Sequence, residues 1–291
     1  MIIKKEAIND VVAKSFCTGF SELDKLMRVA AGNVVIIAGR PLMGKSALNL
    51  NILTNIAKFR EGEAVFFSAE MSSNQVMDRL ASAETSVNLT SIRKGDLSTD
   101  DWARMQRFIS EEKNIPLTIV GNSNLNIDEM RTQLNRIKRE TGGKLSAIGA
   151  DYLQLMEGVI GQYNVDNVST IIRTLKALGH EFGCPVFLLS QLSRDVENRP
   201  NKRPIMSDLR DSGAIEHDAD IITMIYRNDH YEQRENGGSA KLDGMAEIII
   251  LKNTNGSTGT VRLGFEGKYA RFTNHMPAMH DLDDEPNYEE Q

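Results

Sequence analysis

The sequence predicts an α/β protein in which helices flank a twisted, mostly parallel sheet, with an antiparallel extension at its C-terminal end. Apolar strand-like runs alternate with amphipathic helical stretches over much of the chain, and this alternation is typical of parallel sheets. A glycine-containing turn separates the first long apolar run from the helix after it. The late apolar runs are separated only by Gly/Asn turns, which favours antiparallel pairing.

The parallel part follows from apolar runs, each followed by a helical pattern. A short helix is expected over 21–27, ahead of this part. Asn126 is suited to open one of the later helices, because an Asn side chain caps exposed N–H groups. The expected strands are 34–39, 64–68, 117–120, the apolar run 145–155 and 185–192, and the expected helices are 45–59, 74–84, 99–112, 127–141 and 168–181.

The later half changes character, with strands expected at 220–226, 246–252 and 260–265 and polar loops at 195–204 and 229–244. We expect residues 1–30 to form an N-terminal linker and 31–275 a single large domain. Residues 276–291 are strongly acidic, and we expect them to be a disordered tail.

Composition limits the class of protein. The chain has 291 residues, 41% hydrophobic residues and a formal net charge of −6, so any contact with nucleic acid must come from a local basic patch. Cys17 and Cys184 lie far apart and match neither a disulfide framework nor a zinc site. The cysteine usage favours a reducing, cytoplasmic setting. No run is long enough to span a membrane and no signal peptide is visible, so we expect no membrane contact.

The stretch AGRPLMGKSA fits the pattern G-x-x-x-x-G-K-[ST] between a strand and a helix. In this arrangement backbone N–H groups and a helix N-terminus hold phosphate oxygens, a lysine neutralises the β- and γ-phosphates and a hydroxyl binds magnesium. The alternative is a glycine turn that matches by chance, which the strand–loop–helix context disfavours. The expected nucleotide-binding residues are Gly39, Arg40, Pro41, Leu42, Met43, Gly44, Lys45, Ser46 and Ala47.

Two acids and an amide follow other apolar runs. Asp151 and Glu70 each come after a predicted strand, where a carboxylate can hold magnesium or orient water. A single acid there is often only a helix cap, but two beside a phosphate loop favour a catalytic site. Gln191 ends the run VFLLSQ, and its amide is placed to sense a γ-phosphate.

Together these motifs resemble the C-terminal motor domain of bacterial replicative ring helicases of the DnaB type, from about Phe20 to Phe272. GRPLMGKS is similar to that family's phosphate loop, FFSAEMS to its catalytic-glutamate segment and DYLQL to its magnesium-carboxylate motif. SQLSR, SDLRDSGAIEHDAD and AEIIILKNTNGSTGTVRLGF are similar to its glutamine sensor, its DNA-facing loop and the hairpin that reaches a neighbouring subunit. The resemblance implies a RecA-like P-loop core in a hexameric ring around single-stranded DNA.

The resemblance also implies roles for individual residues. Lys45 and Ser46 match the phosphate lysine and the magnesium hydroxyl, and Asp151 matches the magnesium carboxylate. Glu70 matches the general base and Gln191 the γ-phosphate sensor. Arg79 matches an arginine near the nucleotide, although an exposed helix face would explain it equally well. The implied ligands are ATP and Mg²⁺, and the implied reaction is ATP hydrolysis coupled to 5′-to-3′ movement on DNA during replication.

The DNA-facing loop is identified on the same basis. Arg210, Asp211 and Gly213 match a loop in which an arginine and backbone N–H groups grip phosphates, so binding should depend on salt and little on sequence. The nearby basic residues would add positive charge or merely be solvated; they are Arg194, Arg199, Lys202 and Arg203.

The hairpin departs from the family pattern. Lys252 is present, but the position of the arginine finger is Thr254, which cannot supply a delocalised positive charge to a transition state. Lys252 alone could suffice with slower turnover, Arg262 or Arg271 could substitute, or hydrolysis could be poor. Arg262 belongs to the family's own pattern, where a plain strand role is expected.

The chain begins within what would be the family's linker, so we expect a motor-only protein without the N-terminal helical domain that recruits primase. Three functions stay open: a ring helicase motor, an ATP-binding protein that modulates a host replicative helicase while hydrolysing little, and a RecA-like ATPase of recombination or repair. The DNA-loop motif disfavours the third. A second copy of the chain and a helicase loader are the other expected partners.

Overall fold

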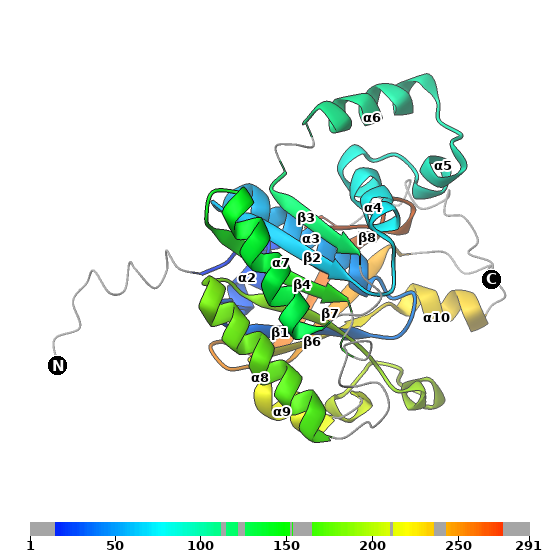
Figure 1. The fold of residues 1–291 in the computed structure, drawn as a ribbon. Helices are drawn as coiled ribbons and strands as arrows, with labels where there is room; N and C mark the ends of the chain where they lie inside the picture. The colour runs from blue at the N-terminus through cyan, green and yellow to red at the C-terminus, as the bar shows by residue number, and fades with distance from the viewer. Residues whose placement is uncertain are drawn as a thin grey trace.

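The computed structural model describes residues 15–111, 115–121, 126–151, 153, 165–209, 212–235 and 243–275. These residues form a nine-stranded sheet with the strand order β3-β2-β4-β5-β1-β6-β7-β8-β9. Helices lie on both faces of the sheet (Figure 1). The predicted α/β architecture is therefore confirmed.

The strands from β3 to β6 pair in parallel, as the alternation of strands and helices predicts. Every residue of β1 and β4 is buried, because these central strands are covered on both faces. Their bounds are β1 Val34–Gly39, β2 Glu63–Ser68, β3 Leu117–Gly121, β4 Leu145–Asp151, β5 Val186–Gln191 and β6 Ile221–Tyr226.

The predicted antiparallel extension is also confirmed. Strand β7 (Met245–Asn253) pairs antiparallel with β6, and β8 (Gly259–Glu266) pairs antiparallel with β7. A short strand that the sequence analysis missed, β9 (Arg271–Thr273), completes the sheet. Buried and half-buried residues alternate along β7, which is the pattern of a sheet covered on one face.

The direction of each crossover connection determines which face of the sheet its helix covers. The chain moves one way along the sheet from β1 to β2 and the other way from β3 to β4 and β5, so right-handed connections place their helices on opposite faces. Helices α7 (Ile127–Glu140) and α8 (Val165–Phe182) cover one face, and α3 (Lys45–Phe59) and α4 (Ser73–Thr85) belong to the other (Figure 1). The cap of α7 is Asn126, whose side chain accepts from the N–H of Asp128, as predicted.

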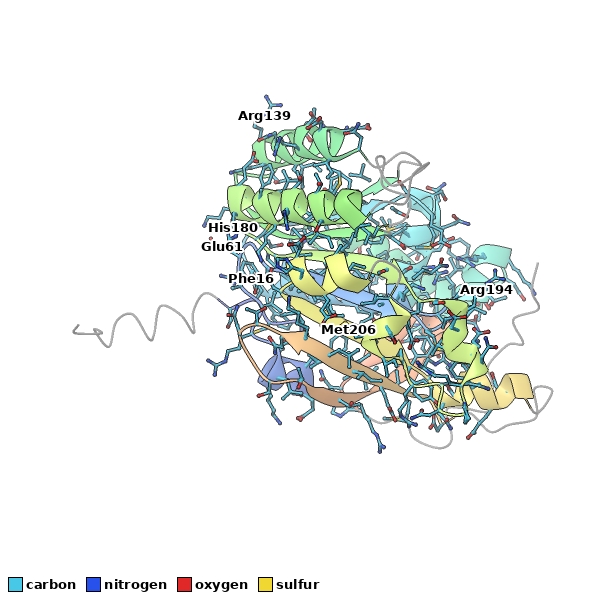
Figure 2. The ribbon with its side chains drawn as sticks, turned by 90° about the horizontal axis from the view of Figure 1, so that it is seen from below. Phe16, Glu61, Arg139, His180, Arg194 and Met206 are labelled. Carbon is cyan, nitrogen blue, oxygen red and sulfur yellow. The ribbon has the colours of Figure 1, made fainter. Side chains whose placement is uncertain are left out.

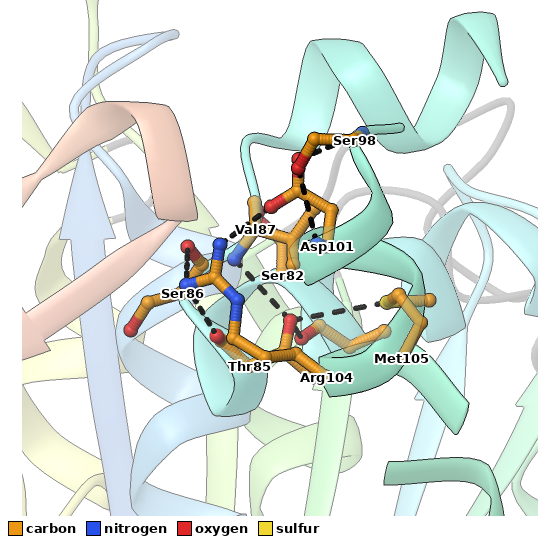
Figure 3. A network of polar contacts seen from close by, with 9 residues as sticks. Ser82, Thr85, Ser86, Val87, Ser98, Asp101, Arg104 and Met105 are labelled. Atoms are coloured by element: carbon orange, nitrogen blue, oxygen red, sulfur yellow. Dashed lines mark hydrogen bonds and ion pairs between the residues drawn. The ribbon is translucent and has the colours of Figure 1, made fainter. Parts of the chain in front are cut away.

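A small helical unit extends from α4. Helix α5 (Leu89–Lys94) leads into α6 (Thr99–Glu111), which lies away from the sheet (Figure 1). The guanidinium of Arg104 on α6 donates to the carbonyl oxygens of Thr85 and Ser86 at the end of α4 (Figure 3). Trp102 and Ile109 stay exposed, whereas Phe108 is buried and Met105 packs against the core, so both apolar and polar contacts hold α6 in place.

The prediction of a polar loop over 229–244 is wrong for residues 229–235, because Asn228–Glu235 form helix α10. Tyr231 on α10 is buried and stacks on Tyr226 of β6, with ring centroids 5.7 Å apart. Tertiary packing therefore folds a segment whose local sequence is polar.

The predicted tail 276–291 lies outside the described residues. Within the described part of the chain, no helix is both long and apolar enough to cross a bilayer.

Candidate nucleotide site

The phosphate loop connects the end of β1 to the start of α3. Gly44 precedes α3 with a left-handed φ of 95°, which glycine adopts without strain. Leu42 also has a positive φ, of 66°, an uncommon conformation for a side chain of this size. No side chain caps the N-terminus of α3, so its first N–H groups are available to an anion.

Ser46 and Asp151 meet at the ends of α3 and β4. The Ser46 hydroxyl donates to Oδ2 of Asp151 across 2.8 Å. Asp151 is 1% exposed, and this burial raises the pKa of its carboxyl to about 6 against the lowering effect of the Ser46 hydrogen bond. A buried carboxyl beside a hydroxyl is suited to a hard cation, whose charge would offset the cost of burying the carboxylate.

Lys45 completes a charged cluster with Glu70 and Arg79. Burial lowers the pKa of the Lys45 ammonium, while the charges of Asp151 and Glu70 raise it. Glu70 is exposed just beyond β2, and Arg79 is half-buried on α4. The charge of Arg79 lowers the pKa of Asp151 and its Nε atom is buried, so Arg79 is not a fully solvated residue on an outer helix face.

Gln191 lies beside the phosphate loop, since it is the strand partner of Gly39 in the β1–β5 pairing. The next residue of the loop, Arg40, reaches across to the segment after Gln191. Its guanidinium donates to the carboxylate of Glu197 at 2.8 Å and to the carbonyl of Leu192 at 2.9 Å. Sequence reasoning gave Arg40 only a general place in the loop and missed Glu197 altogether.

Another residue that the sequence analysis missed is Arg227, directly after β6. Its guanidinium is buried, lies 4.1 Å from the centroid of the Phe265 ring and donates to Asp229 at 3.1 Å. Phe265 in turn packs close to Gly44, where a Cβ atom would lie 3.1 Å from the ring. Arg227 also donates to the carbonyl of Leu42 in the phosphate loop at 3.5 Å, and it therefore supports this loop. Its signal in the sequence was a lone arginine directly after a largely apolar strand.

The hairpin residues do not join this cluster. The N–H of Thr254 and its hydroxyl both donate to the carbonyl of Asp220, whose own N–H bonds Val34 at the start of β1. The phosphate loop leaves β1 at the other end, about 17 Å further along the strand. The Lys252 ammonium donates to the carbonyls of Glu216 at 2.5 Å and His217 at 3.2 Å.

Neither arginine considered as a substitute for the finger lies at the hairpin turn. Arg262 is the strand partner of Glu247, which itself pairs with Tyr226 at the far end of β6. Arg271 binds Glu266 at 2.7 Å and the Ser86 hydroxyl at 2.8 Å within its own chain. Both positions are therefore unsuited to act in place of Thr254.

The DNA-loop prediction falls partly outside the described residues, because Arg210 and Asp211 are not among them. Gly213 is described and lies exposed near the start of helix α9 (Ser212–Asp218). A Cβ atom at Gly213 would meet nothing within 4 Å. Its surface is therefore open to a partner.

A separate cavity of about 630 Å³ lies at the other end of the sheet, lined in part by Phe16, Phe59, Arg60 and Phe182. Phe16 and the lining residue Glu61 lie at this end, and Arg194 at the opposite one (Figure 2). The 15-residue helix α3 separates Phe59 from Lys45, which is roughly 20 Å at ~1.5 Å per residue. This cavity is distinct from the phosphate loop.

Comparisons with known proteins identify the family of the chain. The family described as "DnaB-like helicase C terminal domain" matches residues 15–274. A probable replicative DNA helicase of Trieres chinensis is 41% identical over 91% of this chain and 58% of its own length. The replicative DNA helicase DnaB of Geobacillus stearothermophilus is 39% identical over 88% of this chain and 56% of its own length. The chain thus spans somewhat more than half the length of these relatives.

Solved structures give the same result. One of them, an ATPase domain, superimposes with a TM-score of 0.82 at 33% identity, covering 93% of this chain and 95% of that one. A DnaB-like replicative helicase, solved to show its interactions with primase, superimposes with a TM-score of 0.81 at 32% identity over 94% of this chain and 67% of its own. By sequence and by fold, the chain belongs to the DnaB-like helicase C-terminal domain family.

Proposed function

We propose that this chain is the motor of a ring-shaped DNA helicase that hydrolyses ATP to move along single-stranded DNA during replication. The observation that carries the proposal is the separation of two parts of one site. Lys45, Ser46 and Asp151 lie together at one end of the sheet, whereas Lys252 is bound near the other. If Lys252 acts on a nucleotide, as the family resemblance implies, that nucleotide would be bound to a neighbouring copy, and a head-to-tail contact of this kind can close into a ring. Six copies are our proposal by family membership.

The cluster suits an ATP–magnesium complex. The amides at the start of α3 and the Lys45 ammonium would bind the phosphates, and Ser46 with Asp151 would hold Mg²⁺, which neutralises phosphate charge during phosphoryl transfer. Glu70 would orient the attacking water, and Arg79 would stabilise charge near Asp151. Gln191 would sense the γ-phosphate, since its strand partner Gly39 opens the loop.

On the DNA side, Arg210, Asp211 and Gly213 would contact phosphates in the centre of the ring. The names of the relatives, replicative DNA helicases, support this use of the chain. A loader protein is a further proposed partner. The cytoplasm is the proposed location, since replication takes place there in bacteria.

Thr254 favours a second candidate, an ATP-binding protein that joins a host helicase and hydrolyses little. Its hydroxyl is engaged by the Asp220 carbonyl at 2.9 Å, and it cannot replace a guanidinium.

Steady-state ATPase rates with and without single-stranded DNA separate the two functions. A motor should be stimulated by DNA, and Lys45→Ala should abolish turnover. A wild-type rate no higher than that of Lys45→Ala, with DNA present, would instead support the modulator.

A further inference from the structure

Arg40 connects the phosphate loop to the chain segment that leads to the DNA loop. Its Nε lies 2.8 Å from Oε1 of Glu197, and its Nη1 lies 2.9 Å from the carbonyl oxygen of Leu192. The two side chains are 12% and 30% exposed, so the ion pair is more shielded than most surface pairs. Because the guanidinium is planar, two contacts from it fix both the distance and the angle between the segments.

Arg40 contacts the segment 192–209, whose two ends are joined by hydrogen bonds so that it forms a closed loop. Leu192 and Leu209 form an antiparallel bridge, and the N–H of Ser193 donates to the carbonyl of Asp208 at 2.7 Å. The guanidinium of Arg199 binds both oxygens of the buried Asp208, at 3.0 and 2.7 Å. A displacement of one end of this segment is therefore carried to Leu209.

Glu197 is held within this closed segment by the 3₁₀-helix η3 (Arg194–Asn198), whose Val196 is fully buried. The other end of the segment, Leu209, directly precedes Arg210 in the chain. Direct contacts thus run from the phosphate loop through Arg40 to Leu192, and the bridge continues them to Leu209. Glu197 ties Arg40 to the same closed segment. Coupling between two sites needs a connected element of this kind.

The state of Arg40 also depends on the nucleotide site. The Lys45 ammonium donates to the backbone carbonyl of Arg40 at 3.2 Å. A phosphate that attracts Lys45 competes with this hydrogen bond, so phosphate binding changes the restraint on the residue that grips Glu197.

We propose that Arg40 and Glu197 form a latch, in which Glu197 is a positioning residue that couples the phosphate loop to the DNA loop. The latch rests on the proposed motor function and adds a route beside the one through Gln191. It predicts that Glu197 affects communication between ATP and DNA, and not the binding of either ligand alone.

The test compares Glu197→Ala and Glu197→Gln with Asp195→Asn in the full chain. Asp195 lies on the same 3₁₀-helix, is exposed and contacts the Ser193 hydroxyl, so its variant is a matched control for charge removal. The measurements are kcat and KM for ATP with and without oligo-dT, and oligo-dT affinity with and without a non-hydrolysable ATP analogue.

For Glu197→Ala we expect DNA stimulation of kcat to fall roughly fivefold or more, within the usual range of allosteric coupling. The effect of the ATP analogue on DNA affinity should shrink in parallel, since binding linkage is reciprocal. The basal kcat and the KM for ATP should stay within about twofold of wild type. Glu197→Gln should be intermediate, because an amide oxygen still accepts from Arg40 but carries no charge.

Stimulation of Glu197→Ala equal to that of Asp195→Asn would overturn the latch, as would a collapse of basal kcat in a folded variant. If Glu197→Ala does not fold, Glu197→Gln and Glu197→Asp carry the same comparison, and wild-type stimulation in both overturns the latch. Absence of DNA stimulation in the wild type is a distinct result, which overturns the motor function and the latch with it.

Discussion

The Ser46 hydroxyl donates to the buried carboxylate of Asp151 across 2.8 Å, joining the first turn of α3 to the end of β4. These residues lie 105 positions apart in the chain. The contact gives the proposed magnesium site a titratable group close to physiological pH. The effect of this contact on magnesium-dependent nucleotide binding and its effect on the stability of the metal-free fold can be measured separately.

Magnesium-dependent nucleotide binding should weaken as the pH falls through about 6, because protonation of Asp151 removes the charge that a cation requires. Titration of a fluorescent ADP analogue with Mg²⁺ between pH 5 and 8 measures this effect. Asp151→Asn should bind weakly at every pH, and Asp128→Asn, which alters an exposed acid on α7, should keep the wild-type profile. A pH-independent wild type would contradict the assignment of Asp151.

Asp151 should also make the metal-free fold less stable at neutral pH. Its pKa in the fold is about 6, above the unfolded value near 3.8. Its stabilising contribution is therefore complete below about pH 4 and is lost as the pH rises from 4 to 6. The difference corresponds to ~3 kcal/mol at most. Urea unfolding at pH 7.5 without Mg²⁺ should show Asp151→Asn to be more stable than wild type, and a less stable variant would contradict this.

Mixing two inactive variants should restore hydrolysis if the site forms between copies. Lys45→Ala and Lys252→Ala should each be inactive with DNA present. In an equal mixture about a quarter of the interfaces pair an intact phosphate loop with an intact Lys252, as expected for a head-to-tail ring. Mixing Lys45→Ala with the double variant is the control and should restore nothing. No gain in the first mixture would argue against a shared site.

Thr254→Arg should raise the DNA-stimulated kcat by roughly tenfold or more, because arginine fingers in other NTPases contribute about 10³ to 10⁵. We expect a gain below that range because Lys252 already supplies one positive charge. Thr254→Ala is the matched control, since it loses the hydrogen bond to Asp220 without gaining a charge. Equal rates for the two variants would show that this position does not reach a neighbouring nucleotide.

Asn49→Leu should stabilise the fold. Asn49 on α3 is fully buried, and neither its amide nitrogen nor its amide oxygen has a hydrogen-bond partner among the described residues. An apolar side chain of similar shape removes two unpaired polar groups, which cost about 1–3 kcal/mol. Chemical denaturation measures the change against Asn51→Leu, which should be destabilising because Asn51 accepts from the N–H of Phe272. A loss of stability in Asn49→Leu would indicate a buried water at the amide.

Local signals in the chain were enough to predict most of the elements. The helix 45–59 follows from its glycine-rich start and apolar pattern, and the structure gives the same bounds. Asn88 and Gly95 cap the short helix α5, a local signal that the sequence analysis overlooked. The order of the phosphate-loop residues was likewise readable, since the left-handed backbone favours glycine at position 44 and binding of phosphate and magnesium requires lysine and serine directly after it.

Tertiary structure alone decided which distant residues meet. Tyr231 anchors α10 by packing on Tyr226. Arg40 binds Glu197, which lies 157 positions away in the chain. Lys252 lies apart from the phosphate loop of its own chain because antiparallel pairing carries β7 back toward the start of β6. Spacing in a sequence fixes contacts only over a helical turn or a hairpin. Contacts across the sheet depend on strand order and register, which form only when the whole core packs.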